Sequence, residues 1–235
     1  MLKAIFFDLD GTLLPMDQEE FLNAYFSQLS HRMAPLGYDP KALIDTVMRG
    51  TYAMIKNDGT KTNEQVFWQT FCSVFGEDAI KDKDYVDAFY SNEFLKVQSV
   101  CPQNPKVPAF ISHLKEKNLR LILATSPIFP EVGTYNRIRW AGLDPSDFEF
   151  ITTYENSSVS KPNLEYYKWL LDKFNLDPAQ CLMVGNDVGD DMVAESLNMK
   201  VFLLTDYLIN RNNTDVSHIP QGNVDALCSY IDTLI

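Results

Sequence analysis

The chain has 235 residues, of which 46% are hydrophobic, and it carries a formal net charge of −12. This length suits one large domain or one domain with an insert, and the apolar content permits a sizeable core. The acidic balance argues against a nucleic-acid-binding face, which requires clustered cations, but a local site could still bind a small anionic molecule.

The sequence also gives expectations about compartment. No apolar stretch approaches the roughly 20 residues that span a bilayer, and residues 1–8 hold one lysine and reach an acid too soon for a secretory signal. The cysteines are scattered without metal-binding spacing, which predicts buried reduced thiols; they are Cys72, Cys101, Cys181 and Cys228. We therefore expect a cytoplasmic protein without membrane contact, either a monomer or a weak homodimer.

The first predicted strand is the bulky apolar run of residues 4–7. It ends at Asp8 and Asp10, which stand beside Gly11, a residue that lets the backbone turn sharply. Aspartate and glycine could form an ordinary polar turn here. We favour a functional pair of carboxylates, because the other groups that such a site requires follow later strands.

Helical periodicity then continues from residue 16 to about residue 100. Four amphipathic helices are predicted, at residues 18–32, from Asp39 onward, after a capping box at Thr62, and around residues 85–90. They predict a compact helical bundle, residues 16–100, whose apolar stripes form core in preference to a ligand site. Several positions could face either the site or the core and are left open: Met16, Phe21, Tyr25, Arg49 and Lys56.

Strands and helices alternate after Cys101. Strands are predicted at residues 119–124, 148–152, 181–184 and 200–204, and helices at 105–117, 131–140, 162–174, 190–198 and 224–234. This order predicts an α/β fold, a Rossmann-like parallel sheet with helices on both faces. The sheet domain would comprise residues 1–15 and 101–235, with the helical bundle inserted as a second domain.

Ligands of open parallel sheets bind beyond the carboxyl ends of the strands. Asp8, Thr125 and Asp187 each follow a predicted strand closely, so the topology alone brings them to one edge. Taken singly, each group has an ordinary interpretation. Thr125 could belong to a turn, Lys161 could be a solvated lysine, and the acidic residues 186–191 could begin a helix. Their joint placement predicts one site.

The charges at this edge indicate what it binds. Four aspartates, Asp8, Asp10, Asp187 and Asp191, would repel one another unless a cation lay among them. A ligand set made only of oxygen, with no neighbouring histidine or cysteine, suits Mg²⁺ better than zinc. Lys161 would add the positive charge that a phosphoryl group needs besides the metal.

The order of these motifs resembles that of the haloacid dehalogenase-like (HAD) hydrolases, most of which are magnesium-dependent phosphatases. The resemblance covers the sheet domain, and the helical insert resembles the cap of the group that includes phosphoglycolate phosphatase and beta-phosphoglucomutase. It implies an Asp8 nucleophile that forms an aspartyl phosphate and an Asp10 general acid and base. The further implied roles are phosphate binding by Thr125, Ser126 and Lys161, and Mg²⁺ binding by Asp8, the Asp10 carbonyl and Asp187, with Asp191 in the outer shell.

One departure and several alternatives remain at this stage. Many relatives have an aspartate where this chain has Asn186, so the metal position could fall on Asn186 or on Asp187, and we assign it to Asp187. A small phosphorylated metabolite is the expected substrate, with phosphomutase or phosphonatase chemistry as alternatives. Asp10 disfavours dehalogenation, and the motif order disfavours a receiver-like phosphate-binding protein. Residues 207–221 could border the site or form a solvated loop.

Overall fold

The computed structural model describes residues 1–235 and is built around one six-stranded sheet with the strand order β3-β2-β1-β4-β5-β6. All neighbouring strands are parallel, and β1 lies in the middle, where Phe6 pairs with Ile122 on one side and Met183 on the other. The strands are β1 (Ala4–Phe7), β2 (Arg120–Leu123), β3 (Phe150–Ile151), β4 (Cys181–Gly185), β5 (Lys200–Leu204) and β6 (Gln221–Gly222).

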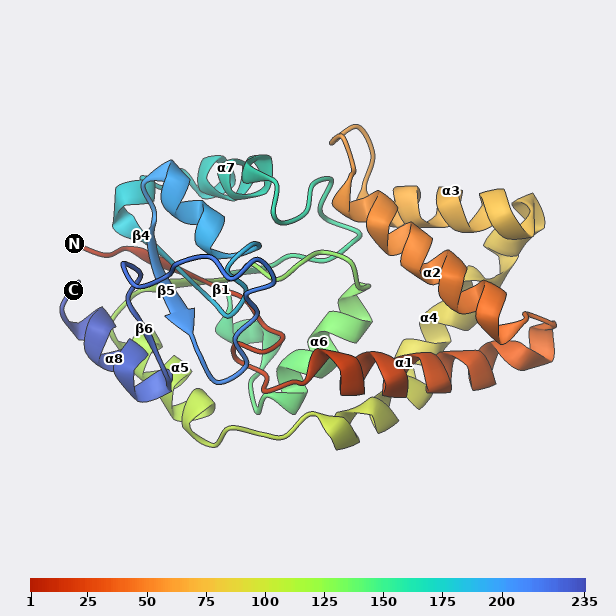
Figure 1. Ribbon diagram of the computed structural model, residues 1–235, viewed down its shortest axis with the longest axis horizontal. Helices are drawn as coiled ribbons and strands as arrows, with labels where there is room; N and C mark the ends of the chain where they lie inside the picture. Colours follow the sequence, from red (N-terminus) through yellow and green to blue (C-terminus); the bar gives the residue numbers. More distant parts are fainter.

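Alternate residues of the strands supply two separate apolar layers, because successive side chains point to opposite faces of a sheet. Phe7 and Val184 belong to one cluster with residues of α5 and α8, whereas Phe6 and Met183 belong to another with residues of α7. Figure 1 shows α7 on one side of the sheet and α5 and α8 on the other. The helices are α5 (Lys106–Glu116), α6 (Glu131–Trp140), α7 (Leu164–Phe174) and α8 (Val224–Asp232).

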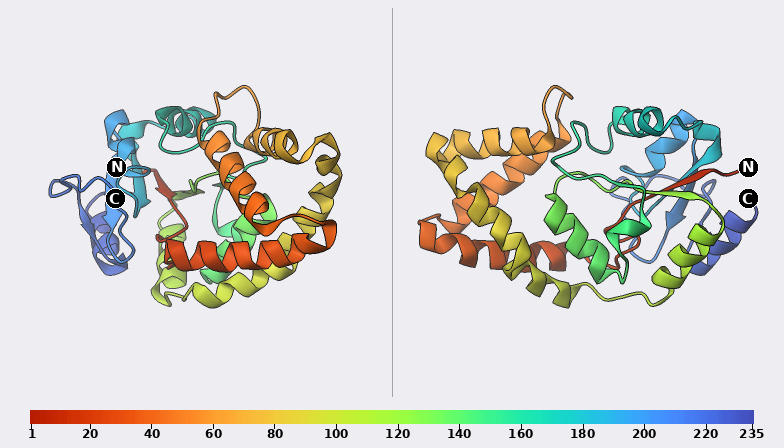
Figure 2. Two further views of the ribbon diagram at one scale, coloured as in Figure 1. Left: turned by 45° about the vertical axis from the view of Figure 1, so that its right-hand side comes forward. Right: turned by 180° about the vertical axis from the view of Figure 1, so that it is seen from behind.

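Residues 18–100, which lie between β1 and α5 in the chain, are helical and stand to one side of the sheet (Figures 1 and 2). We call residues 18–100 the helical insert. Its α-helices are α1 (Gln18–Met33), α2 (Pro40–Ile55), α3 (Asn63–Phe75) and α4 (Lys83–Ser91), and 3-10 helices run over Ala34–Leu36, Glu77–Asp82 and Glu93–Val100. The side chain of Asp17 caps α1, and Thr62 and Gln65 form the expected capping box of α3.

Aromatic side chains join the insert to the sheet domain. The ring centroids of Phe94 and Trp140 lie 4.9 Å apart, and those of Tyr25 and Phe129 lie 5.6 Å apart. The same apolar cluster therefore extends from the sheet into the insert, without a separate core for each. This shared core fixes α1 close to the N-terminus of α6.

A second, polar junction lies at the start of α3 and is centred on the fully buried side chain of Asn63. Its amide nitrogen donates to the Pro127 carbonyl at 2.9 Å and to Ser160 Oγ at 3.0 Å, while its oxygen accepts from Asn57 at 2.8 Å. The Asn63 backbone N–H also donates to the Ser157 carbonyl. Two loops of the sheet domain are thereby tied to the insert.

The predicted fold class is confirmed, and most predicted elements agree within a few residues. One expectation was wrong in detail, and one strand was not predicted. The expected helix at residues 190–198 is a short 3-10 helix, Met192–Leu197, because the Asp191 side chain turns inward and accepts a hydrogen bond from the Asp187 N–H. The polar segment after β5 supplies strand β6, which is only two residues long and has no apolar run to signal it.

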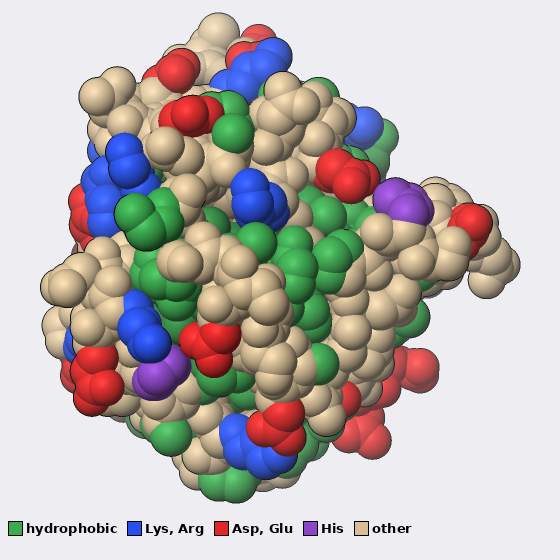
Figure 3. Space-filling view, turned by 90° about the vertical axis from the view of Figure 1, so that its left-hand side faces the viewer, with side chains coloured by type: hydrophobic (Ala, Val, Ile, Leu, Met, Phe, Trp, Pro, Cys, Tyr) green, Lys and Arg blue, Asp and Glu red, His purple; other side chains and the backbone are tan.

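The cysteines and the helix lengths can be compared with the expectations from the sequence. All four cysteines are free, and all but the half-buried Cys228 are buried. None of the helices is both long and apolar enough to cross a bilayer. At the end of the molecule that carries both termini, cationic and anionic side chains are interspersed around apolar ones (Figure 3).

Candidate active site

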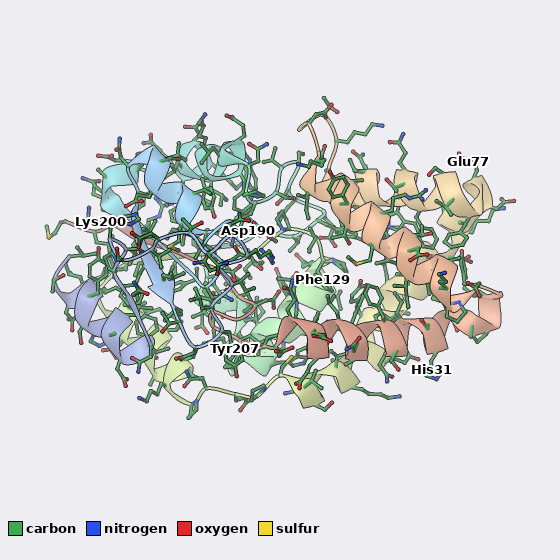
Figure 4. All side chains as sticks on the ribbon, viewed as in Figure 1. His31, Glu77, Phe129, Asp190, Lys200 and Tyr207 are labelled. Atoms are coloured by element: carbon green, nitrogen blue, oxygen red, sulfur yellow. The ribbon has the colours of Figure 1, made fainter.

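The predicted site residues line one cavity of about 340 Å³ between the sheet edge and the helical insert. Asp8 follows β1, Thr125 follows β2, and Asn186 and Asp187 follow β4, so the parallel topology brings them together. Figure 4 shows Asp190 and Tyr207 on the sheet-domain side and Phe129 next to the insert. The cavity lining includes all the predicted site residues: Asp8, Asp10, Thr125, Ser126, Lys161, Asp187 and Asp191.

A tight turn after β1 presents Asp8. The Asp8 N–H continues the sheet by donating to the Val184 carbonyl at 2.9 Å. Gly11 has a φ of +78°, and a Cβ at this position would collide with the side chain of Asn186. Glycine is therefore required here both by the backbone conformation and by the close approach of the β4 loop. The Thr12 hydroxyl lies 3.2 Å from Asp8 Oδ2 and 3.0 Å from Asn186 Oδ1.

Lys161 connects two carboxylates inside the protein. Its Nζ lies 2.9 Å from Asp8 Oδ1 and 2.6 Å from Asp191 Oδ1, and only 1% of its side chain is exposed. Burial alone would lower the pKa of Lys161, but the charges of Asp191 and Asp8 outweigh it and raise that pKa well above its usual value. The lysine is therefore a permanent cation beside Asp8.

Asp191 is the second partner of this lysine. Burial raises the pKa of the Asp191 carboxyl to about 7, Lys161 opposes that rise, and the charge of Asp8 adds to it. Asp191 Oδ2 also accepts the Asp187 N–H at 3.0 Å. Asp191 therefore positions both the lysine and the loop after β4.

Asp10 is held by Arg137, a residue of α6 that the sequence gave no reason to select. Its guanidinium pairs with Asp10 Oδ2 and lies 4.2 Å from the centroid of the Phe129 ring. Further bonds of 3.3 Å reach the Thr134 hydroxyl and the Gly133 carbonyl. Burial raises the pKa of Asp10 and Arg137 opposes that rise. An arginine within a helix has no local pattern that separates a buried partner of the site from a solvated side chain.

Thr125 is fixed through its backbone. The Thr152 hydroxyl donates to the Thr125 carbonyl at 2.6 Å, and the Tyr166 hydroxyl reaches the same carbonyl at 3.0 Å. The residue is buried, and it remains part of the cavity lining. These bonds hold Thr125 by its carbonyl at the end of the cavity that contains Asp8.

Residues 207–211 border the site, as one of the two alternatives for this segment predicted. Asn186 Nδ2 donates to the Tyr207 carbonyl at 2.7 Å, and the Ile209 N–H donates to the Asn186 carbonyl at 2.9 Å. Arg211 Nη1 lies 2.5 Å from Asp187 Oδ2, although 57% of the arginine side chain is exposed. The segment therefore brings a partly exposed cation to the acidic end of the cavity.

The donor set at this end suits a hard cation. Carboxylates of Asp8, Asp10 and Asp187 share the cavity, and Asp10 Oδ1 is buried without a hydrogen-bond partner. In this conformation no group of acidic, histidine or cysteine side chains is gathered tightly enough to enclose a metal. Ion pairs with Lys161, Arg137 and Arg211 hold these carboxylates instead. A donor set made only of oxygen, with no histidine or cysteine in the cavity lining, fits Mg²⁺ better than a softer metal.

The insert corrects one expectation about its helices. Apolar stripes were expected to be core, but Leu22, Phe26 and Met48 line the cavity that contains Asp8. The periodicity correctly located the apolar faces and could not show that part of them faces a void. Of the insert positions left open, Tyr25 lines the cavity; Met16, Phe21, Arg49 and Lys56 do not.

A parallel sheet with carboxylates and a buried lysine at its strand ends, facing a helical insert, is the architecture of an α/β enzyme with a charged site at the sheet edge. The chain belongs to the haloacid dehalogenase-like hydrolases, whose family model matches residues 2–197. The predicted family is thereby confirmed, and with it the expectation that the chain is a hydrolase.

Individual relatives are distant but align over nearly the whole chain. The chain is 25% identical to a phosphoglycolate phosphatase of Vibrio vulnificus over 100% of this chain and 96% of the relative. It resembles the crystal structure of a HAD phosphatase from Thermococcus onnurineus with a TM-score of 0.58 and 16% identity, covering 98% of each chain. It also resembles a 2-haloacid dehalogenase from Pseudomonas syringae, with a TM-score of 0.65, 19% identity and full coverage of both chains. At these identities the two structures support the fold alone.

Proposed function

We propose that the chain is a magnesium-dependent phosphatase of small phosphomonoesters that works through a phosphorylated Asp8. The observation that carries this proposal is the placement of Asp8 beside the buried cation of Lys161, with Asp10 in the same cavity. A dehalogenase of this family has no need of an acid two residues after its nucleophile. Here Asp10 is held in place by Arg137, which supports a proton-transfer role.

The reaction has two displacements. In the first, an Asp8 carboxylate oxygen attacks phosphorus, the bond between phosphorus and the ester oxygen breaks, and the departing alcohol takes a proton from Asp10. In the second, a water molecule gives its proton to Asp10 and attacks phosphorus, and the bond to Asp8 breaks. The products are the alcohol and inorganic phosphate, and both aspartates return to their initial states.

The chain supplies part of the charge that a phosphoryl group requires. Lys161, together with the hydroxyls of Thr125 and Ser126, would bind the phosphoryl oxygens. The Asp8 side chain, the Asp10 carbonyl and Asp187 would hold Mg²⁺, with Asp191 close by. When bound, the metal neutralises charge on the phosphoryl oxygens. Of the two candidates, Asp187 is the one with a carboxylate, a ligand that Mg²⁺ prefers, which supports assigning the metal position to Asp187.

We assign residues 1–15 and 101–235 to the catalytic domain and residues 16–100 to a cap that closes the cavity away from the sheet. A cap lysine would be required for the Schiff base of a phosphonatase, but the insert contributes no lysine to the cavity lining. This observation favours phosphatase over phosphonatase. A phosphomutase would need the same Asp8 chemistry with water excluded from the phosphorylated enzyme.

The proposal is tested by measuring phosphate release from a panel of phosphomonoesters with Mg²⁺, for the native chain and for Asp8→Asn. The substitution removes the nucleophile and nearly preserves its shape, so kcat should fall by at least about 10³-fold. Asp172→Asn, an exposed aspartate on α7, is the matched control and should retain full activity. Equal rates for native and Asp8→Asn protein would refute the proposal.

A further inference from the structure

The two ends of the cavity differ in charge. All its charged lining residues come from the sheet domain: Asp8, Asp10, Lys161, Asp187, Asp190, Asp191 and Arg211. The helical insert contributes no charged side chain to the lining. Its contribution is mainly apolar and includes Leu22, Phe26, Val47, Met48, Ile55 and Phe67. A substrate that places its phosphoryl group against Asp8 must therefore place its leaving alcohol against an uncharged wall.

The lysines and arginines of the insert do not line the cavity. Arg32 pairs with Glu93, and Lys83 pairs with Glu64 and Asp87. Arg49 and Lys56 are exposed and lie outside the cavity lining. No cationic group of the insert is therefore placed to neutralise a second anionic group on the substrate.

Few polar atoms of the insert wall are free for a ligand: the buried Nε1 of Trp68 has no hydrogen-bond partner, and the amide of Gln18 is exposed to solvent. The hydroxyls of Tyr25 and Tyr90 lie 2.9 Å apart and bond to each other. Burial raises the pKa of Tyr25 to about 12, so this pair stays neutral. The Thr51 hydroxyl bonds to the Val47 carbonyl within its own helix. The wall therefore offers rings and alkyl groups more readily than donors.

These observations decide between two kinds of leaving group. A carboxylate against this wall would lose its hydration without gaining a cation, and the single unpaired N–H of Trp68 would not replace that hydration, so its placement there is unfavourable. An alkyl or aromatic group would gain from the same desolvation. A cavity of about 340 Å³ also exceeds what a phosphoryl group alone needs and lies within the range of sites for small organic ligands.

We propose that the substrate is a phosphomonoester whose leaving alcohol is apolar, alkyl or aromatic, and that the walls of α1, α2 and α3 select it against small anionic alcohols such as glycolate. This inference rests on the proposed phosphatase function and adds the substrate class. The relative from Vibrio vulnificus is named a phosphoglycolate phosphatase, and the leaving alcohol of phosphoglycolate carries a carboxylate. The proposed preference of this chain for an apolar leaving alcohol differs from that, and we assign the difference to the insert.

A matched pair of substrates separates the effect of the insert wall on substrate preference from the reactivity of the phosphate ester. Hexyl phosphate and its analogue with a terminal carboxylate have the same length and nearly the same leaving-group reactivity. We expect kcat/KM to be at least about tenfold higher for hexyl phosphate, the discrimination that a small difference in an apolar pocket can supply. An equal or higher kcat/KM for the carboxylate analogue would overturn the inference.

Substitutions at Thr51, a half-buried lining residue of α2, change the wall itself. Thr51→Trp fills the cavity, and the ratio of kcat/KM for hexyl phosphate over methyl phosphate should fall by about tenfold. Thr51→Lys adds a cation, and the preference between the matched esters should shift toward the carboxylate. Thr70→Trp is the control. Thr70 is also a half-buried threonine bonded within its helix, on α3 and outside the lining, so both ratios should stay unchanged.

Calorimetry separates failure of this inference from failure of the proposed function. If no ester is hydrolysed, the phosphatase proposal fails, but the dissociation constants of the matched esters still report the preference of the wall. Tighter binding of hexyl phosphate would support the apolar site, and tighter binding of its carboxylate analogue would overturn it. Thermal unfolding of the Thr51 variants identifies any variant that fails to fold, in which case the matched pair with native protein decides.

Discussion

The sheet-domain end of the cavity and its helical-insert end are built from opposite kinds of side chain. At the first, strand ends and loops hold charged groups in pairs, such as Lys161 between Asp8 and Asp191. At the second, faces of α1, α2 and α3 present apolar side chains with no charge among them. The backbone topology of the sheet therefore fixes the groups of the proposed phosphoryl transfer. The side chains of the insert helices set the proposed preference for the leaving alcohol, and they can be exchanged without altering the strand ends.

The largest effect on stability should come from removing the charge of Lys161 at the sheet-domain end of the cavity. Lys161→Met leaves the buried carboxylates of Asp8 and Asp191 without their cation, so the free energy of unfolding should fall by about 3–5 kcal/mol. Chemical denaturation measures this change. Lys168→Met, which removes an exposed lysine paired with Glu165, should cost less than about 1 kcal/mol. A similar small loss for Lys161→Met would show that the buried pairs do not stabilise the site.

The next largest effect should come from disturbing the position of the Asp10 carboxyl group. Arg137→Lys keeps the charge and loses the planar fork that reaches Asp10, Thr134 and Gly133, so kcat should fall by about 10²-fold while KM changes much less. Steady-state kinetics on one ester measures both. Arg139→Lys, an exposed arginine of the same helix, should leave kcat unchanged. An unaltered kcat in Arg137→Lys would remove Arg137 from the account as a positioning residue.

The junction between the two ends depends on Asn63. Asn63→Ala removes the bonds to the Pro127 carbonyl and Ser160 and one of the two hydrogen bonds that the Asn57 amide nitrogen donates, so the free energy of unfolding should fall by about 1–3 kcal/mol. Ser160, which loses its bond to Asn63, is the neighbour of Lys161 in the chain. The position of Lys161 should therefore be less well fixed, and kcat should fall as well. Asn212→Ala, at an exposed position, is the control for the measurement by denaturation. Full stability of Asn63→Ala would show that the Asn63 side chain does not help to join the insert to the sheet domain.

The smallest effect concerns the exposed pair of Arg211 and Asp187. Arg211→Gln should change the free energy of unfolding by less than about 1 kcal/mol, because the arginine is largely solvated. It should also lower the Mg²⁺ concentration at which the metal raises the melting temperature, by up to about fivefold, since the arginine no longer competes for Asp187. Arg49→Gln, an exposed arginine of the insert, should not move this concentration. A weaker response to Mg²⁺ in Arg211→Gln would contradict metal binding by Asp187.

The same contrast explains what the sequence could predict. Asp8, Thr125 and Asp187 were found from local patterns, because a polar residue directly after an apolar strand in a parallel sheet must lie at the ligand-binding edge. Lys161 could be assigned only together with the other groups and with the family resemblance, since a lysine before a proline is otherwise unremarkable in sequence. Arg137 could not be found at all, because its role depends on how α6 docks against the turn after β1.

The apolar cavity shows the second reason for a missed feature. Periodicity identifies the apolar face of a helix, and Leu22, Phe26 and Met48 belong to such faces. Whether that face meets another helix or a void depends on how far apart the helices stand. That separation is set by contacts such as Phe94 with Trp140, which join residues distant in sequence and have no local signal.

The account depends most on Asp8 as the group that accepts the phosphoryl group. The direct measurement is to quench the native enzyme in acid during turnover of hexyl phosphate with Mg²⁺ and to determine the mass of the peptide that contains Asp8. We predict that this peptide carries the added mass of one phosphoryl group and that the modification is absent from Asp8→Asn. Turnover without any phosphorylated peptide, or with the phosphoryl group on another residue, would contradict the account.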